Sequence, residues 1–322
     1  MKVVKSLERK GKEITLIDNS PVFEFTPSIL KAAVDPEMLK NIQVYHKSHL
    51  KCRFIQGKVS DVKKDKVLVN GKKVVFENLV IATGGRPRHL GFEAEAVYKG
   101  EDVKKTHQKI TKAKDILIVG GGYVGVELAA EIIETFPKKK VVLVHPHSNL
   151  MNRQPGKTGK LARNFLEKKG VKIILGRRIK KQEGNYYFTD DGRKIKSDLV
   201  FNCTGTVPNS EAFKDFLEVD KSGRVIVDEF LRAKGFKNIY AIGDVNNIPE
   251  EKTAHNAEKQ ARTLVKTLLR EKLKRYVPRD EPMVTSLGRW NGIFSYKGLT
   301  FGGIIPAILK PIIEWKVLKK IK

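Results

Sequence analysis

Cysteine is almost absent from this chain of 322 residues: Cys52 and Cys203 are the only two, and they lie far apart. No C-x-x-C or C-x₄-C pair is present, which excludes a dithiol redox centre and a cysteine metal site of the usual spacing. We therefore expect no metal site and no disulfide framework. The cysteine usage fits a reducing compartment such as the cytoplasm.

Long apolar runs and acidic charge are also scarce. No apolar run reaches the roughly 18 residues that a membrane-spanning helix requires, and no signal peptide is visible. The chain has 36 acidic and 63 basic residues, a net charge of +27. Such a balance suits a solvated lysine-rich surface, an anionic membrane surface or nucleic acid. Because the basic residues are spread out and form no motif interleaved with aromatic residues, we expect no nucleic-acid partner.

A glycine-rich motif lies near the middle of the chain, within residues 115–131 (DILIVGGGYVGVELAAE). Gly120, Gly122 and Gly125 fit the pattern G-x-G-x-x-G, between a buried-strand run and an amphipathic helical pattern. The first glycine allows a tight turn, the second lets the backbone approach a pyrophosphate, and the third lets helix and strand pack closely. With a second strand at 141–144, this context predicts dinucleotide binding at the helix N-terminus. The alternative is a glycine-rich turn that binds nothing.

The chain also contains an internal repeat. Residues 13–87 and 114–208 share an order of strands, helix and hairpin, and they end in the equivalent sequences ATGGRP and CTGTVP. This predicts an α/β fold with two Rossmann-like dinucleotide-binding domains, each with a parallel sheet and a β-meander crossover, plus a C-terminal amphipathic segment. The expected domains are 1–110 with 205–282, then 111–204, then the segment 283–322.

The repeat also indicates what the first module lacks. In the second copy, Gly120 precedes His145 at the strand end by about 25 positions. In the first copy the strand ends at Asp18, so its own glycine loop would lie before residue 1. We therefore expect this module to lack its first strand and glycine loop, through a late start codon, a truncation or degeneration.

Three features together resemble the pyridine nucleotide-disulfide oxidoreductase superfamily of two-domain flavoproteins. They are the glycine loop with Glu127, the paired T-G strand ends, and YAIGD followed by KTAHNAEKQA. The resemblance covers nearly the whole chain, although the redox cysteine pair of the superfamily is absent. The sequences FTP after Asp18 and SLGRWNG near the C-terminal end are most similar to type II NADH:quinone oxidoreductases. They are also similar to the apoptosis-inducing-factor-2 (ferroptosis suppressor) branch.

The resemblance implies FAD in the first module. Asp18 corresponds to the acid that hydrogen-bonds the adenosine ribose of FAD. Gly243 and Asp244 correspond to the residues that bind the ribityl or phosphate region of FAD. Ala254 and His255 open a helix whose N-terminus would stabilise negative charge on the reduced flavin. The other residues that the resemblance places near FAD are Thr26, Pro27, Val59, Ala82, Thr83 and Gly84.

The resemblance implies NAD(P)H in the second module. Glu127 is the expected catalytic residue, orienting the nicotinamide and handling a proton, and Thr204 and Gly205 would line the cleft. His145 stands where NAD-binding proteins usually place an acid. A histidine there, with Arg153 downstream, removes the repulsion of a 2′-phosphate. The sequence therefore permits NADPH and leaves the choice between NADH and NADPH open.

The C-terminal residues 298–322, GLTFGGIIPAILKPIIEWKVLKKIK, combine an apolar face at helical spacing with five lysines. Pro306 and Pro311 are expected to break or kink the helix. The stretch is too short and interrupted to span a bilayer, and it favours an in-plane anchor on an anionic leaflet. The alternatives are packing on the protein's own core and a homodimer interface.

We interpret the chain as an FAD-dependent NAD(P)H oxidoreductase that passes electrons to a quinone at the inner, cytoplasmic face of a membrane. One alternative is a soluble NAD(P)H-dependent flavin reductase or oxidase with another acceptor. The other is a non-enzymatic remnant without FAD. The sequence leaves the electron acceptor and the oligomeric state open.

Overall fold

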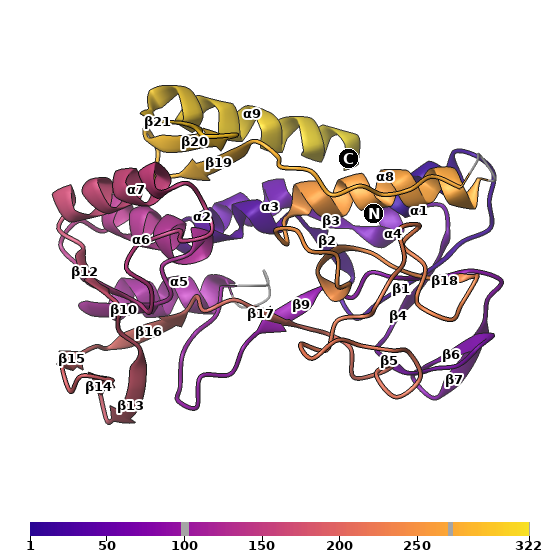
Figure 1. The fold of residues 1–322 in the computed structure, drawn as a ribbon, viewed down its shortest axis with the longest axis horizontal. Helices are drawn as coiled ribbons and strands as arrows, with labels where there is room; N and C mark the ends of the chain where they lie inside the picture. Colours follow the sequence, from indigo (N-terminus) through magenta and orange to yellow (C-terminus); the bar gives the residue numbers. More distant parts are fainter. Residues whose placement is uncertain (98–102, 270–272, 322) are drawn as a thin grey trace.

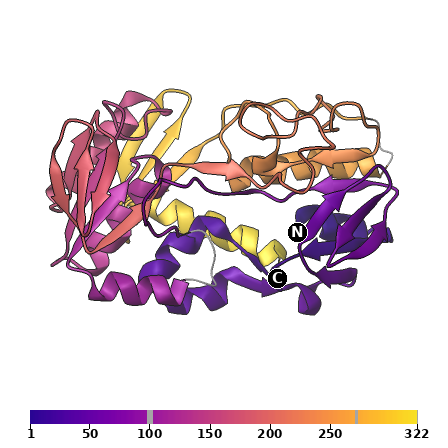
Figure 2. The same cartoon turned by 90° about the horizontal axis from the view of Figure 1, so that it is seen from below.

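The computed structural model describes residues 1–97, 103–269 and 273–321 and has the predicted α/β architecture. Figures 1 and 2 show two halves side by side, with the second repeat on the left of Figure 1 and the first on the right. Between them, β9 (Gly85–Pro87) pairs in antiparallel fashion with β17 (Thr206–Pro208), which joins the two T-G segments. The C-terminal elements lie along the top of Figure 1.

The second repeat forms one four-stranded parallel sheet. Its order is β12 (Lys172–Leu175), β11 (Lys140–His145), β10 (Asp115–Val119) and β16 (Leu199–Asn202). Strand β10 is buried from residue 116 to 119, as expected of a central parallel strand covered on both faces. The helices of this half are α5 (Val103–Lys112), α6 (Tyr123–Thr135) and α7 (Gly156–Lys168).

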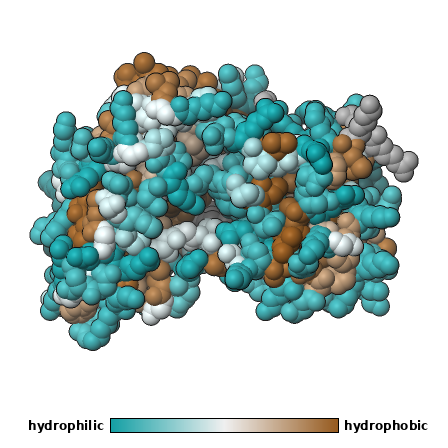
Figure 3. All heavy atoms as spheres, viewed as in Figure 1, coloured by the Kyte–Doolittle hydropathy of each residue, from teal (hydrophilic) through white to brown (hydrophobic). Residues whose placement is uncertain are grey.

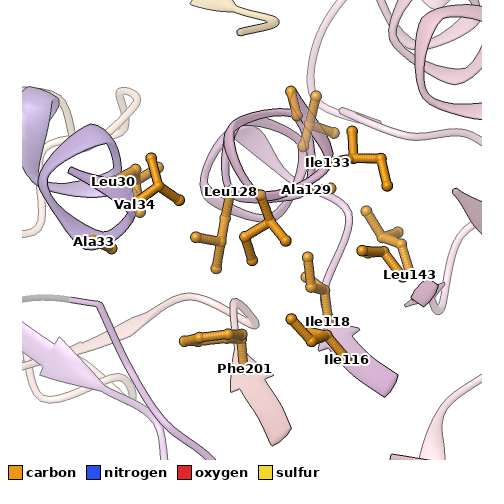
Figure 4. Close-up of a cluster of buried hydrophobic side chains, with 14 of the residues drawn as sticks. Leu30, Ala33, Val34, Ile116, Ile118, Leu128, Ala129, Ile133, Leu143 and Phe201 are labelled. Carbon is orange, nitrogen blue, oxygen red and sulfur yellow. The ribbon is translucent and has the colours of Figure 1, made fainter. Parts of the chain in front are cut away.

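Helix α6 carries the core that joins the two repeats. Figure 4 shows Leu128 of α6 between Phe201 of the sheet and Leu30 of α2 (Ile29–Val34), which belongs to the first repeat. These side chains are at most 6% exposed. Burying an aliphatic side chain of this size contributes about 1.5–3 kcal/mol. The two halves are therefore held by a common apolar core.

The parallel sheet of the first repeat is divided into two pairs. Strand β1 (Thr15–Asp18) pairs with β4 (Arg53–Gln56), and β8 (Leu79–Ile81) pairs with β18 (Ile239–Ala241). Within the described residues no strand joins β1 to β8, whereas β10 joins the equivalent strands β11 and β16. The division agrees with the expected lack of a first strand, and the domain assignment itself stays a prediction.

Both predicted meanders are present as three-stranded antiparallel sheets. One consists of β5 (Val59–Val62), β6 (Lys66–Val69) and β7 (Lys72–Val75), and the other of β13 (Ile179–Glu183), β14 (Tyr186–Thr189) and β15 (Lys194–Lys196). Asn70 and Gly71, at the turn of the first, have φ angles of 50° and 75°. Two successive positive φ angles are what a type I′ turn requires.

The remaining elements cover the sheet edges and the top of the molecule. Helix α1 (Lys2–Glu8) packs against α8 (Ala254–Leu268), and α9 (Ile304–Ile321) packs against β19 (Met283–Ser286) and β20 (Gly292–Tyr296). Strand β21 (Leu299–Gly303) completes that antiparallel sheet. The short elements are β2 (Val22–Glu24), η1 (Thr26–Ser28), η2 (Pro36–Met38), α3 (Leu39–Ile42), β3 (Gln43–Tyr45), α4 (His46–His49) and η4 (Gly243–Val245).

Two sequence-based expectations about local structure need correction. The β-branched run at residues 224–227 (RVIV) predicts a strand, but these residues form only isolated bridges, because their partners lie on three separate segments. Helix α9 is continuous through Pro311, so of the expected break or kink the break does not occur. Pro306 lies in the first turn of α9, where an intrahelical bond from its nitrogen is not needed.

Candidate functional site

One cavity of 3290 Å³ runs between the two halves, and its walls come from both. The carboxyl ends of β1, β8, β10 and β11 open into it, which is where open α/β sheets bind ligands. All of the predicted site residues except Gly125 lie on its wall. They are Asp18, Thr26, Pro27, Val59, Ala82, Thr83, Gly84, Gly120, Gly122, Glu127, His145, Arg153, Thr204, Gly205, Gly243, Asp244, Ala254 and His255.

The three glycines of the central motif have different surroundings. A Cβ on Gly120, where φ is 111°, would lie 2.3 Å from the Cys203 carbonyl oxygen, and one on Gly125 would lie 1.8 Å from the Gly120 carbonyl oxygen. A Cβ on Gly122 would meet no atom within 4 Å. Gly120 and Gly125 therefore hold strand and helix together, while Gly122 leaves space on the cavity wall. The N-cap residue of α6 is Gly122, which has no side chain to cap the helix, so the first N–H groups of α6 suit a pyrophosphate.

His145 is buried and holds the glycine loop. Its Nδ1 accepts a hydrogen bond from the Gly121 N–H at 2.9 Å, and its Nε2 lies 3.3 Å from Asn152 Oδ1. Since Nδ1 accepts, the proton of the neutral ring is on Nε2, which donates to Asn152. Arg153, the other residue expected near a 2′-phosphate, lies 3.3 Å from Glu251 in an ion pair. Both residues thus have partners within the protein.

Glu127 lies in a cluster of buried charges. Its Oε1 accepts hydrogen bonds from Lys310 Nζ at 2.6 Å and from the Ser286 N–H at 2.8 Å. The Glu127 and Lys310 side chains are only 12% and 11% exposed. One helical turn along α6, Glu131 accepts a hydrogen bond from Ser286 Oγ at 3.2 Å, and burial raises the pKa of Glu131. The cluster fixes the Glu127 carboxylate at the cavity wall.

Lys310 is a site residue that the sequence did not indicate. By sequence it belongs with the cationic side chains of the C-terminal segment, whereas in the structure it lies on the buried face of α9 with Glu314. Burial also raises the pKa of Glu314. The available signal was the helical spacing: Lys310 and Glu314 are four residues apart and so lie on one helix face.

The first half supplies polar groups at its end of the cavity. Asp18 Oδ1 accepts a hydrogen bond from the Ser20 N–H at 2.9 Å at the end of β1. Arg224 lines the cavity, and its buried Nε has no hydrogen-bond partner in the described part of the chain. Burial raises the pKa of Asp244, against the opposing charges of Lys252 and Arg224. An unpartnered guanidinium nitrogen beside this cavity suits an anionic group of FAD.

Helix α8 begins at the same cavity. Thr253 caps it, accepting a hydrogen bond from the Asn256 N–H at 3.2 Å. His255 lies 3.1 Å from Glu281, so its ring has a partner within the protein. Gln260, farther along α8, accepts a hydrogen bond from the Gly243 N–H at 2.8 Å and thereby ties the Gly-Asp turn to the helix. The positive end of α8 is thus aimed at the first half's end of the cavity.

No group of three potential metal-ligating side chains occurs within residues 1–97, 103–269 and 273–321. Cys203 is partly buried beside the glycine loop, and burial raises the pKa of its thiol to about 12. A thiol in this state is a packing residue rather than a nucleophile.

Comparison with known proteins identifies related sequences and folds. The family model described as pyridine nucleotide-disulphide oxidoreductase matches residues 1–261. Ferroptosis suppressor protein 1 of Xenopus tropicalis is 30% identical, over 94% of this chain and 87% of that protein. Apoptosis-inducing factor homolog A of Dictyostelium discoideum is also 30% identical, over 92% and 83%. NDH2 from Plasmodium falciparum, solved with NADH, has the same fold, with a TM-score of 0.85 at 14% identity over 98% of this chain and 92% of that one.

Proposed function

Because the chain belongs to the pyridine nucleotide-disulphide oxidoreductase family, an oxidoreductase family with FAD and NAD(P)H as cofactors, we propose that it reduces a quinone at a membrane surface. The observation that carries this proposal is the cavity shared by both halves, with the Glu127–Lys310 pair on its wall and α9 behind it. We assign FAD to residues 1–110 with 205–282, and NAD(P)H to residues 111–204.

The proposed roles of the residues follow from their surroundings. Gly120 and Gly122 bring backbone N–H groups of the α6 N-terminus to the NAD(P)H pyrophosphate. Arg224 and the α8 N-terminus hold the anionic parts of FAD. Glu127 orients the nicotinamide, and Lys310 balances the buried charge of its carboxylate. When bound, the two cofactors supply the hydride transfer and pass the electron pair on to the acceptor.

The exposed face of α9 supports the membrane proposal. None of the helices in the described part of the chain has the length and apolar character that crossing a bilayer requires. Yet α9 buries Lys310 and Glu314 and exposes apolar side chains. Figure 3 shows an apolar patch at the upper left of the molecule, where Figure 1 places the first part of α9. The exposed residues of this face are Ile304, Ile305, Ile308, Ile312 and Trp315, which are 43–61% exposed and do not line the cavity, whereas the exposed Ile313 does. Such a face fits an in-plane anchor, and we propose the inner, cytoplasmic leaflet.

Vesicle binding tests the anchor. The double substitution Ile308→Asp/Ile312→Asp is expected to reduce flotation with phosphatidylcholine–phosphatidylserine vesicles by about tenfold or more, because it places charge in the apolar face. Val277→Asp is the matched control, since Val277 is 58% exposed and outside α9. Equal flotation of the double variant and the wild type would exclude α9 as the anchor.

Quinone reduction tests the electron acceptor. With the purified, flavin-containing protein, we expect a short-chain ubiquinone to raise NAD(P)H oxidation by about tenfold or more over the rate with oxygen alone. Oxidation by oxygen at the same rate with and without quinone would instead indicate a soluble oxidase. A colourless protein without flavin absorbance would contradict FAD binding by this chain.

A further inference from the structure

The end of β11 is bordered by two loops that lie side by side. The Arg177 N–H donates to the His145 carbonyl oxygen at 3.1 Å, and the Gly176 N–H donates to the His147 carbonyl oxygen at 3.1 Å. These bonds place the loop after β12 against the loop after β11. His147 and Arg178 therefore border the same part of the cavity wall, beside the glycine loop.

The two loops at this part of the wall are cationic, and the acids beside them are engaged elsewhere. Asp190 Oδ1 accepts a hydrogen bond from the Arg178 backbone N–H at 3.3 Å, and Asp191 pairs with Arg177 and Arg193. Residues 145–148 and 176–180 read HPHS and GRRIK, with no Asp or Glu. Arg177 is paired with Asp191, but Arg178 is exposed and takes part in no ion pair among the described residues. Burial lowers the pKa of His145, and the nearby charges of His147 and Arg178 act in the same direction. Arg178 is thus a guanidinium on the cavity wall without a carboxylate partner.

The structure also explains why His145 cannot do what an acid does at this position. An acid at the strand end accepts hydrogen bonds from the hydroxyl groups of an adenosine ribose and repels a 2′-phosphate. His145 points inward to Gly121 and Asn152 instead. Residues 145–148 and 176–180, which border this part of the wall, therefore offer a ribose hydroxyl no carboxylate acceptor. A phosphate, which carries up to two negative charges, could instead accept hydrogen bonds from the guanidinium N–H groups of Arg178.

We propose that this chain prefers NADPH to NADH, and that Arg178, assisted by His147, receives the 2′-phosphate. The inference rests on the proposed function only in placing the nicotinamide dinucleotide on the second half. It names Arg178 in place of Arg153, which is paired with Glu251. A charge-assisted pair of this kind corresponds to a preference of about 10- to 100-fold.

The test uses calorimetric titration of the whole protein with 2′,5′-ADP and with 5′-AMP, which differ only by the 2′-phosphate. The wild type is expected to bind 2′,5′-ADP about tenfold or more tightly than 5′-AMP. Arg178→Ala is expected to abolish this difference while leaving the affinity for 5′-AMP unchanged, and Arg178→Lys is expected to keep part of it. Lys168→Ala, an exposed lysine on α7 outside the cavity, is the control and should bind both as the wild type does.

Three results would overturn the inference. They are equal affinity of the wild type for the two nucleotides, no binding of either nucleotide, and an equal fall in the affinity for both nucleotides in Arg178→Ala. Neither quinone nor flavin takes part in this titration. A protein that discriminates the nucleotides but reduces no quinone would therefore refute the proposed function and leave this inference standing.

Discussion

Lys310→Met is expected to lower the free energy of unfolding by about 3 kcal/mol, because it leaves the Glu127 carboxylate buried without its counter-charge. Lys310 Nζ lies 2.6 Å from Glu127 Oε1, and both side chains are nearly buried. Once the pair is broken, the Ser286 N–H is the one donor that this oxygen keeps among the described residues. Replacing both partners, as in Glu127→Gln/Lys310→Met, is expected to restore most of the free energy of unfolding that Lys310→Met loses, since no buried charge of the pair then remains unpaired.

Urea unfolding of the two single variants and the double variant, followed by circular dichroism, measures the coupling of the pair. Lys316→Met is the control: this lysine is exposed on the same helix, and the expected change is within about 0.5 kcal/mol. Additive losses in the double variant would show that the two side chains do not stabilise each other. Since Glu127 lines the cavity, both single variants are also expected to lose NAD(P)H oxidation activity.

Gly125→Ala is expected to destabilise the protein by about 3 kcal/mol, whereas Gly122→Ala is expected to leave stability nearly unchanged and weaken NAD(P)H binding. The added methyl at 125 would lie 1.8 Å from the Gly120 carbonyl oxygen, so strand and helix would have to separate. At 122 the methyl would meet no protein atom within 4 Å and would occupy space on the cavity wall.

Thermal unfolding and nucleotide titration of the two variants separate these effects. The expected result for Gly122→Ala is a wild-type melting temperature with an affinity for NAD(P)H lower by about tenfold or more. A Gly125→Ala variant as stable as the wild type would contradict the packing role of that glycine. Wild-type affinity in Gly122→Ala would show that the ligand does not approach the backbone there.

The order of elements was predictable because it depends on interactions between near neighbours in sequence. The apolar run 116–119, the G-x-G-x-x-G spacing and the turn at Asn70 and Gly71 each determine a local conformation. Repeated along the chain, these patterns predicted two α/β modules with meanders, and the structure and its fold relatives confirm that fold class. The family resemblance is likewise confirmed by the family model.

The orientation of side chains toward distant partners could not be predicted in this way. A helical period of 3.6 shows that Lys310 and Glu314 share a face of α9, but it does not say whether that face is inside or outside. The partner of Lys310 is Glu127, 183 residues away, and only the packing of α9 on β19 and β20 brings them together. The buried acids of α6 outweigh the usual preference for placing isoleucine rather than lysine inside.

The sequence by itself determined the fold class, the family and the strand ends and glycine turns that border the cavity, because these features are specified locally. Tertiary structure alone decided which of those residues are free to meet a ligand. His145 points into the protein because Gly121 offers it an N–H, and Arg153 meets Glu251 across the cavity. The Arg178 guanidinium takes part in no ion pair among the described residues. The reason is that Asp191 pairs with Arg177 and Arg193, Asp190 accepts the Arg178 backbone N–H, and the loop of His147 carries no acid.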